Sequence, residues 1–232
     1  GGYYGLPEQL NFPVLFYRKD IIEDELKLKV PQTWEDVYAL VPELQKRNLQ
    51  FGLPQKGLNA QGNDLVTTDI ITLPPSPTYA MLLYQHDGRF YTDGDMASGL
   101  DEEVAIEQFK KWTDLYVNYK LPIQVDFANR FRTGEMPIGI IDYTMYNKLV
   151  VFASEIKGLW DFAPVPGTTL PDGTIRRDVG GGGSAVVMFE HTEDKDAAWQ
   201  FLKWWTSEET QLAFGREMEV RLGASARYPT AN

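Results

Sequence analysis

Short apolar segments with the pattern of β-strands alternate with amphipathic helical segments along the chain. Residues 12–17 (Phe-Pro-Val-Leu-Phe-Tyr) and 136–141 have the strand pattern. The strongest helical pattern spans residues 101–119, where apolar side chains recur every three or four positions, at Ala105, Phe109, Trp112, Tyr116 and Tyr119. Such an alternation predicts an α/β architecture.

The predicted helices begin at residues that favour helix N-caps. Thr33 precedes one helix and places Asp36 in its first turn, where a carboxylate suits the positive end of the helix dipole. Thr192 is predicted to cap a second helix. Ser207 is predicted to cap a shorter third helix that ends at Gly215.

Composition narrows the class of function. The 232 residues include no cysteine, which excludes disulfides, thiol nucleophiles and thiolate metal sites. Lys and Arg number 22 against 33 Asp and Glu, a net charge of −11, and this balance argues against nucleic acid as a partner. The apolar runs are shorter than the roughly 18 residues of a membrane helix.

The sequence contains no recognisable catalytic or metal-binding pattern. His86 lies beside an Asp-Gly turn and His191 precedes a helix cap, so both are interpreted as exposed turn residues. No phosphate-binding loop, paired-histidine motif or nucleophile elbow occurs. We therefore predict neither catalysis, nor a cofactor, nor a metal. A pair of carboxylates that cleaves a sugar bond stays an alternative, because spacing alone selects no pair.

Tyr143 and Tyr146 are the aromatic residues most suggestive of ligand binding. They follow a predicted buried strand at once, where α/β proteins present their binding loops. An aromatic face matches the apolar face of a pyranose, and Asp142 could accept hydrogen bonds from its hydroxyls. The alternative is that the two tyrosines only cover the edge of the sheet.

A run of glycines, residues 180–183, precedes Ser184 and a strand predicted over residues 185–189. Gly-rich segments with Ser also serve as engineered linkers, but the strand pattern continues on both sides, which favours a native segment. Gly181, Gly182 and Gly183 could absorb large backbone changes and so form a hinge.

Several motifs in order along the chain resemble the bacterial extracellular solute-binding proteins of ABC importers, of the sugar-binding type and closest to the large lipoproteins of Firmicutes. The matching segments are residues 4–9 leading to 14–20, the Pro-x-Thr-Trp helix start in 30–37, the Phe-x-x-Gly strand entry in 131–139, and the late helices in 197–211 followed by Gly-Ala-Ser-Ala-Arg at 223–227.

The resemblance implies a periplasmic-binding-protein-like fold of type II. Mapped onto this chain, residues 12–182 form lobe two, and residues 1–11 and 183–232 form hinge segments and part of lobe one. Both ends are expected to be cuts within a longer protein.

The resemblance also implies a set of residues that contact the solute. Tyrosine occupies positions where sugar-binding members often have tryptophan, and it stacks with less area. The implied contacts are Gln9 and Asn11, then Ser76, Thr78 and Tyr79, then Asp142, Tyr143 and Tyr146.

By this resemblance the protein would capture a small solute, a sugar or oligosaccharide, without catalysis and pass it to ABC permease subunits. The full-length protein would be extracellular and lipid-anchored at the cell surface. Two other hypotheses stay open. One is a carbohydrate-active enzyme or a noncatalytic carbohydrate-binding domain, and the other is a protein–protein adaptor with a large exposed apolar patch.

Overall fold

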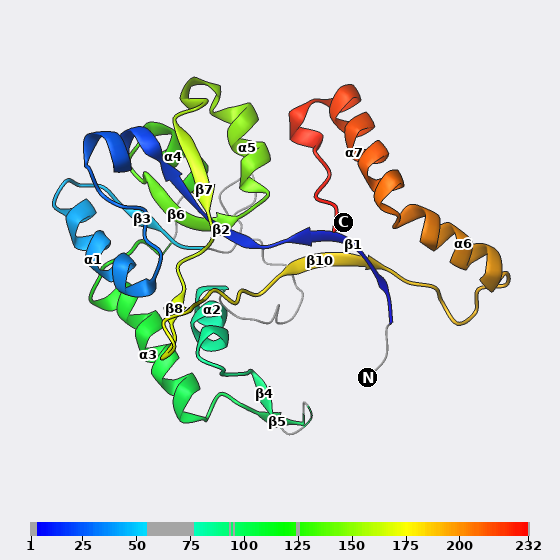
Figure 1. The fold of residues 1–232 in the computed structure, drawn as a ribbon, viewed down its shortest axis with the longest axis horizontal. Coiled ribbons are helices and arrows are strands. Elements are labelled where there is room, and N and C mark those ends of the chain that lie inside the picture. Colours follow the sequence, from blue (N-terminus) through cyan, green and yellow to red (C-terminus); the bar gives the residue numbers. More distant parts are fainter. Residues whose placement is uncertain (1–3, 55–76, 93, 95, 124–125, 232) are drawn as a thin grey trace. The chain divides into compact units, whose positions relative to one another are not determined.

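The computed structural model describes residues 4–54, 77–92, 94, 96–123 and 126–231, which form two compact units (Figure 1). Unit 1 comprises Gly1–Phe12, Tyr143–Glu155 and Gly181–Asn232. Unit 2 comprises Pro13–Asp142 and Ile156–Gly180. The chain therefore passes from one unit to the other four times.

Unit 2 is built on a four-stranded mixed sheet in the order β3-β6-β2-β7. Strand β2 (Pro13–Arg18) pairs antiparallel with β6 (Ile138–Asp142) and with β7 (Trp160–Ala163), and β6 pairs parallel with β3 (Phe51–Gly52). Five of the six β2 residues are buried, because this strand lies inside the sheet. The alternation of strands and helices predicted from the sequence is confirmed.

Helices supply the rest of the unit 2 core. They are α1 (Trp34–Gln45), α2 (Pro77–Gln85), α3 (Glu103–Val117) and α4 (Phe127–Thr133), with a π-helical segment at Asp20–Glu25. The apolar side of α1 packs on the sheet residues Leu15 and Ile138 in one buried cluster. Two short hairpins complete the unit, β4 (Tyr91–Thr92) with β5 (Ala97–Ser98) and β8 (Thr168–Thr169) with β9 (Ile175–Arg176).

Thr33 caps α1 as the sequence predicts. Its hydroxyl accepts a hydrogen bond from Asp36 N at 3.2 Å, and Asp36 Oδ2 accepts one from Thr33 N at 3.0 Å, which is a complete capping box. The backbone N–H of Gln32, followed by that of Thr33, holds the pKa of Asp36 below its usual value.

Thr33→Ala is expected to lower the free energy of unfolding by about 1 kcal/mol, because the Asp36 N–H in the first turn loses its side-chain acceptor. Urea denaturation followed by far-UV circular dichroism measures the change. Thr113→Ala, within α3 and away from any cap, is the control and should change stability by less than about 0.5 kcal/mol. Equal losses in the two variants would contradict the capping role.

Unit 1 contains a two-stranded antiparallel sheet and three helices. Strand β1 (Leu6–Asn11) pairs with β10 (Gly182–Val186). The helices are α5 (Met145–Phe152), α6 (Lys195–Trp205) and α7 (Glu208–Leu222). The chain's last residues return to β1, where Leu10 N donates to Pro229 O and Ala231 N donates to Glu8 O.

A carboxylate ties α6 to this sheet. Glu8 on β1 accepts hydrogen bonds from Trp205 Nε1 at 2.7 Å and from Ser184 Oγ on β10 at 3.0 Å. The hydrogen bond from Trp205 is the largest influence that lowers the pKa of Glu8. Glu8 is thus ionised when it holds the three elements together.

The second half of the glycine run, Gly182 and Gly183, is part of β10, which differs from the strand predicted over residues 185–189. Gly182 lies opposite Asn11 and Gly183 opposite Leu10 in the ladder. A Cβ on Gly183 would lie 2.2 Å from Gln9 O, so only glycine allows this close approach of the strands. The segment therefore has a structural place in unit 1, unlike a free linker.

The late helices differ from the prediction at their ends. Asp194, not Thr192, is the N-cap of α6, because its side chain accepts from Ala197 N. Ser207 caps α7 as predicted, but α7 continues through Gly215 to Leu222 and ends at Gly223, whose φ of 87° suits glycine. Gly215 keeps helical hydrogen bonds because nothing in the sequence after it interrupts the helix.

The expected lobes, residues 12–182 against 1–11 and 183–232, stay a prediction beside this division into units. The chain crosses between the units at Phe12–Pro13 and at Gly180–Gly181, beside the expected boundaries at 12 and 182. Residues 143–155, which were expected in lobe two, group with unit 1. The reason is local, since α5 packs against the short 3-10 turn Ala224–Ala226 near the end of the chain.

Candidate functional site

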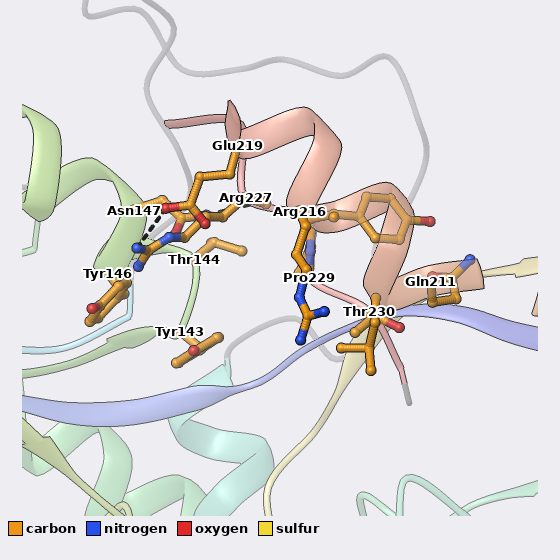
Figure 2. A pocket seen from close by; sticks show the side chains of 13 residues that line it. Tyr143, Thr144, Tyr146, Asn147, Gln211, Arg216, Glu219, Arg227, Pro229 and Thr230 are labelled. Atoms are coloured by element: carbon orange, nitrogen blue, oxygen red, sulfur yellow. Dashed lines mark hydrogen bonds and ion pairs between the residues drawn. The ribbon is translucent and has the colours of Figure 1, made fainter. Parts of the chain in front are cut away.

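An open pocket of about 240 Å³ lies within unit 1 (Figure 2). One wall is the turn into α5, a second is α7, and the third is the segment after α7. The lining residues are Tyr143, Thr144, Tyr146 and Asn147 from the first wall, Gln211, Leu212, Gly215, Arg216 and Glu219 from the second, and residues 227–230 from the third.

Tyr143 and Tyr146 form an aromatic ladder with Phe12. The ring of Tyr143 stacks on Phe12 with centroids 5.7 Å apart and planes at 9°. The ring of Tyr146 stacks in turn on that of Tyr143, with centroids 6.2 Å apart and planes at 18°. Tyr143 N donates to Phe12 O at 2.9 Å, which fixes the ladder to the end of β1. Tyr143 and Tyr146 are half-buried and line the pocket, so part of each ring is accessible there, whereas Phe12 is exposed outside the lining.

Arg227 closes one end of the pocket. Its guanidinium lies over the Tyr146 ring, 5.4 Å from the centroid, and its Nη2 donates to Glu219 Oε1 at 2.8 Å. Asn147 Nδ2 donates to Arg227 O at 3.2 Å and holds the backbone there. The hydrogen bond with Glu219 raises the pKa of Arg227 and lowers that of Glu219, so both stay charged at neutral pH.

A small aromatic core supports the pocket from within unit 1. Tyr228 packs edge-on against Phe214 at 5.1 Å, and Phe214 packs on Trp205 at 5.0 Å. Gln211, 1% exposed, donates from Nε2 to Trp205 O at 2.8 Å. Burial raises the pKa of the Tyr228 phenol. These contacts set the distance between α7 and the last segment, and thereby the width of the pocket.

The structure places the first pair of predicted contacts near the pocket but not in its lining. Gln9 bridges to Thr230, which does line the pocket. Asn11 ends β1 beside Phe12, and within the described residues its Oδ1 is buried without a hydrogen-bond partner. Both residues therefore belong to the strand that supports the aromatic ladder.

The second predicted set lies elsewhere. Ser76 is outside the described residues. Thr78 and Tyr79 are buried in unit 2, 0% and 5% exposed, and Tyr79 donates its hydroxyl hydrogen to Ala105 O at 3.1 Å. This differs from the expectation that they contact a solute, because the aromatic cluster around Phe90 takes up the Tyr79 ring. The proposed site leaves them out.

Asp142 is grouped with a different unit from Tyr143 and Tyr146, the two residues predicted to act with it. It is the exposed last residue of β6 and belongs to unit 2, whereas Tyr143 and Tyr146 belong to unit 1. The tyrosines are the two predicted contacts that line the pocket.

Sequence reasoning missed the charged residues of the pocket. Arg216, Glu219 and Arg227 were given no role, although Arg227 closes the Gly-Ala-Ser-Ala-Arg segment that carries part of the family resemblance. Position alone could not reveal them, because the charges of α7 occur on all its faces.

The described part of the chain offers no sign of a metal site or a membrane-spanning helix. No cluster of three or more His, Asp or Glu side chains is placed to hold a metal ion there. The helices of that part also include none with the length and apolar character needed to cross a membrane.

Comparison with known proteins points to one family. The model of the family described as "Bacterial extracellular solute-binding protein" matches residues 1–212. A protein of Brucella abortus named as a binding protein is 26% identical over 223 residues, which span 91% of this chain and 49% of that protein. The chain thus spans about half the length of the curated relatives it matches.

Solved structures show the same fold. The sugar-binding protein MalE from Xanthomonas citri matches with a TM-score of 0.70 and 18% identity, over 98% of this chain and 56% of that one. Maltose-bound MalE3 of T. maritima matches with a TM-score of 0.65 and 21% identity, over 98% of this chain and 55% of that one. UgpB from Mycobacterium tuberculosis, in complex with glycerophosphocholine, matches with a TM-score of 0.66 and 18% identity, over 99% of this chain and 52% of that one. The predicted periplasmic-binding-protein-like fold of type II is confirmed.

Proposed function

Because the chain belongs to the bacterial extracellular solute-binding proteins, we propose that it captures a small hydroxylated solute, a sugar or oligosaccharide, for an ABC importer. The pocket beside Tyr143 and Tyr146 is the part of unit 1 that we assign to this contact. The permease subunits of the importer are the proposed partners, and the proposed location is the outer face of the cell membrane with a lipid anchor in the full-length protein.

The aromatic ladder is the observation that carries the proposal. Two tyrosine rings, nearly parallel and half-buried, stand in a pocket whose other groups are amides, hydroxyls and charged side chains. A sugar ring presents an apolar face of C–H bonds and a rim of hydroxyls. The rings match the face, and Thr144, Asn147 and Thr230 can exchange hydrogen bonds with the rim.

The charges of the pocket favour binding over catalysis. Cleavage of a glycosidic bond uses two carboxyl groups about 5–10 Å apart. Among the described residues that line this pocket, Glu219 is the one carboxylate, and it is engaged by Arg227. A lowered pKa also makes Glu219 a poor general acid at neutral pH. The solute would therefore leave the pocket unchanged.

A hinge at Gly181, Gly182 and Gly183 remains part of the proposal. The chain crosses between the units directly before Gly181. Gly182 and Gly183 both pair with β1, but a Cβ at Gly182 would meet open space, whereas one at Gly183 would clash with Gln9 O. Gly182→Val should stiffen this crossing more than it disturbs the strand.

Isothermal titration calorimetry with sugars, oligosaccharides and polyol phosphodiesters tests the proposal. Tyr146→Ala is expected to weaken binding of the solute about tenfold, because the stacking face is lost, and Tyr146→Phe should restore most of the affinity. Tyr91→Ala is the matched control, since Tyr91 is half-exposed on the β4–β5 hairpin of unit 2.

Two outcomes would contradict this function. Absence of binding to every solute in the panel would overturn the capture role. If chromatography detects free sugar released from an oligosaccharide, the protein is instead a carbohydrate-active enzyme. A Tyr91→Ala variant as impaired as Tyr146→Ala would move the site out of the pocket.

A further inference from the structure

We propose that the pocket selects a solute that carries an anionic group, a carboxylate or a phosphate, beside its hydroxylated ring. The inference rests on the proposed function, because it takes the pocket beside Tyr143 and Tyr146 as the solute site. It adds a positive charge that is available to the ligand, a property that binding of a neutral sugar to the aromatic ladder does not require.

The pocket carries more positive than negative charge. Its described lining includes two guanidinium groups, Arg216 and Arg227, and one carboxylate, Glu219. This local excess of one positive charge contrasts with the net charge of −11 for the chain. A locally positive site favours an anionic solute against the long-range repulsion of an acidic protein.

The two arginines differ in their ion pairs among the described residues. Arg227 is held by Glu219 at 2.8 Å and by the Tyr146 ring, so its charge is balanced and its position fixed. Arg216 forms no ion pair with a carboxylate of the described chain. Its sequence neighbour Glu217 does not neutralise it, because Glu217 pairs with Arg221 one turn further along α7.

Arg216, which has no ion pair among the described residues, lines the same pocket as the two tyrosines. Figure 2 shows Arg216 extending from α7 into the space between Tyr143 and Thr230. A planar guanidinium binds a carboxylate or phosphate through two parallel hydrogen bonds, which no neutral group of the pocket can do. A solute that contacts the accessible parts of Tyr143 and Tyr146 would lie in the same pocket as the Arg216 guanidinium.

The first turn of α5 adds to the positive electrostatic potential of the pocket. The pocket residues Thr144 and Tyr146 lie at the start of this helix, whose positive dipole end therefore faces the pocket lining. The Thr144 side chain makes no capping hydrogen bond to that turn. This contribution supports Arg216 and would not constitute an anion site without it.

Calorimetric titration of the 232-residue chain with galactose, galacturonate and galactose 6-phosphate tests the inference. At least one acidic sugar should bind about tenfold more tightly than galactose in 25 mM salt, and the advantage should shrink in 300 mM salt. Arg216→Gln should reduce the ratio of acidic to neutral affinity to near one. Arg221→Gln, outside the pocket on the same helix, should keep the ratio of the wild type.

The outcomes separate this inference from the proposed function. Binding of galactose as tightly as its acidic forms would overturn the inference and leave the capture role intact. A ratio that survives Arg216→Gln would also overturn it. Failure of all three ligands together with the wider solute panel would overturn the capture role, and the inference with it. Preference for galacturonate or for galactose 6-phosphate identifies the anionic group.

Discussion

Phe131→Ala is expected to lower the free energy of unfolding by about 4 kcal/mol. Phe131 lies in α4 and is completely buried. Its ring stacks on Phe127 at 5.1 Å and meets Trp160 of β7 edge-on at 6.4 Å. Alanine would remove these contacts and leave a cavity, because α4 is held in place by other interactions and cannot move in to fill the space.

Urea denaturation followed by circular dichroism measures this loss. Phe189→Ala is the matched control, because Phe189 is 76% exposed and its removal should cost less than about 0.5 kcal/mol. A loss below about 1 kcal/mol for Phe131→Ala would mean that α4 moves into the space and that its position is not fixed.

Arg18→Met is expected to cost about 3 kcal/mol at neutral pH. The Arg18 guanidinium is buried and donates from Nε and Nη2 to Asp20 at 2.8 and 2.6 Å. Its Nη1 donates to the backbone carbonyls of Phe131 and Arg132 at 3.0 and 3.1 Å, at the C-terminal end of α4. Methionine fills a similar volume but leaves two carbonyls and one carboxylate without their donor.

The cost of Arg18→Met should fall in acid. The hydrogen bond from Arg18 is the main cause that lowers the pKa of Asp20 in the folded protein. A carboxyl with a lowered folded pKa stabilises the protein above its unfolded pKa of about 3.9, and this contribution is lost as pH falls through the folded value. The gap between wild type and variant should therefore narrow below about pH 4.

Arg47→Met serves as the control for charge removal. Arg47 forms an exposed ion pair with Glu43 at 3.3 Å, which should contribute less than about 0.5 kcal/mol. If Arg18→Met costs no more than Arg47→Met, the buried guanidinium does not hold α4 to the sheet. A cost independent of pH would instead contradict the contribution of the bond between Arg18 and Asp20.

Local signals in the sequence predicted local structure well. The Thr33 cap, the Ser207 cap and the strands β2 and β6 occur where the patterns indicate, because capping and apolar periodicity depend on residues close in the chain. The error at Thr192 has the same origin. Thr192 and Asp194, two positions apart, both have side chains that can cap a helix, and in the structure Asp194 accepts from Ala197 N.

Helix faces were harder to predict. The apolar residues of α6 were typical of a buried face, yet no residue of α6 is buried among the described residues, and Phe201 is 57% exposed. Periodicity shows which side of a helix is apolar. It does not show what covers that side, since burial depends on a partner that may be distant in the chain.

By itself the sequence determined the alternation of strands and helices, the capped helix starts, the absence of thiol chemistry and the two tyrosines after β6. Tertiary structure alone decided that these tyrosines meet Arg216, Glu219 and Arg227, and that Thr78 and Tyr79 are taken into a core. The physical reason is range. Hydrogen bonds and periodicity within an element are written in neighbouring residues, whereas a pocket is made by segments that only packing brings together.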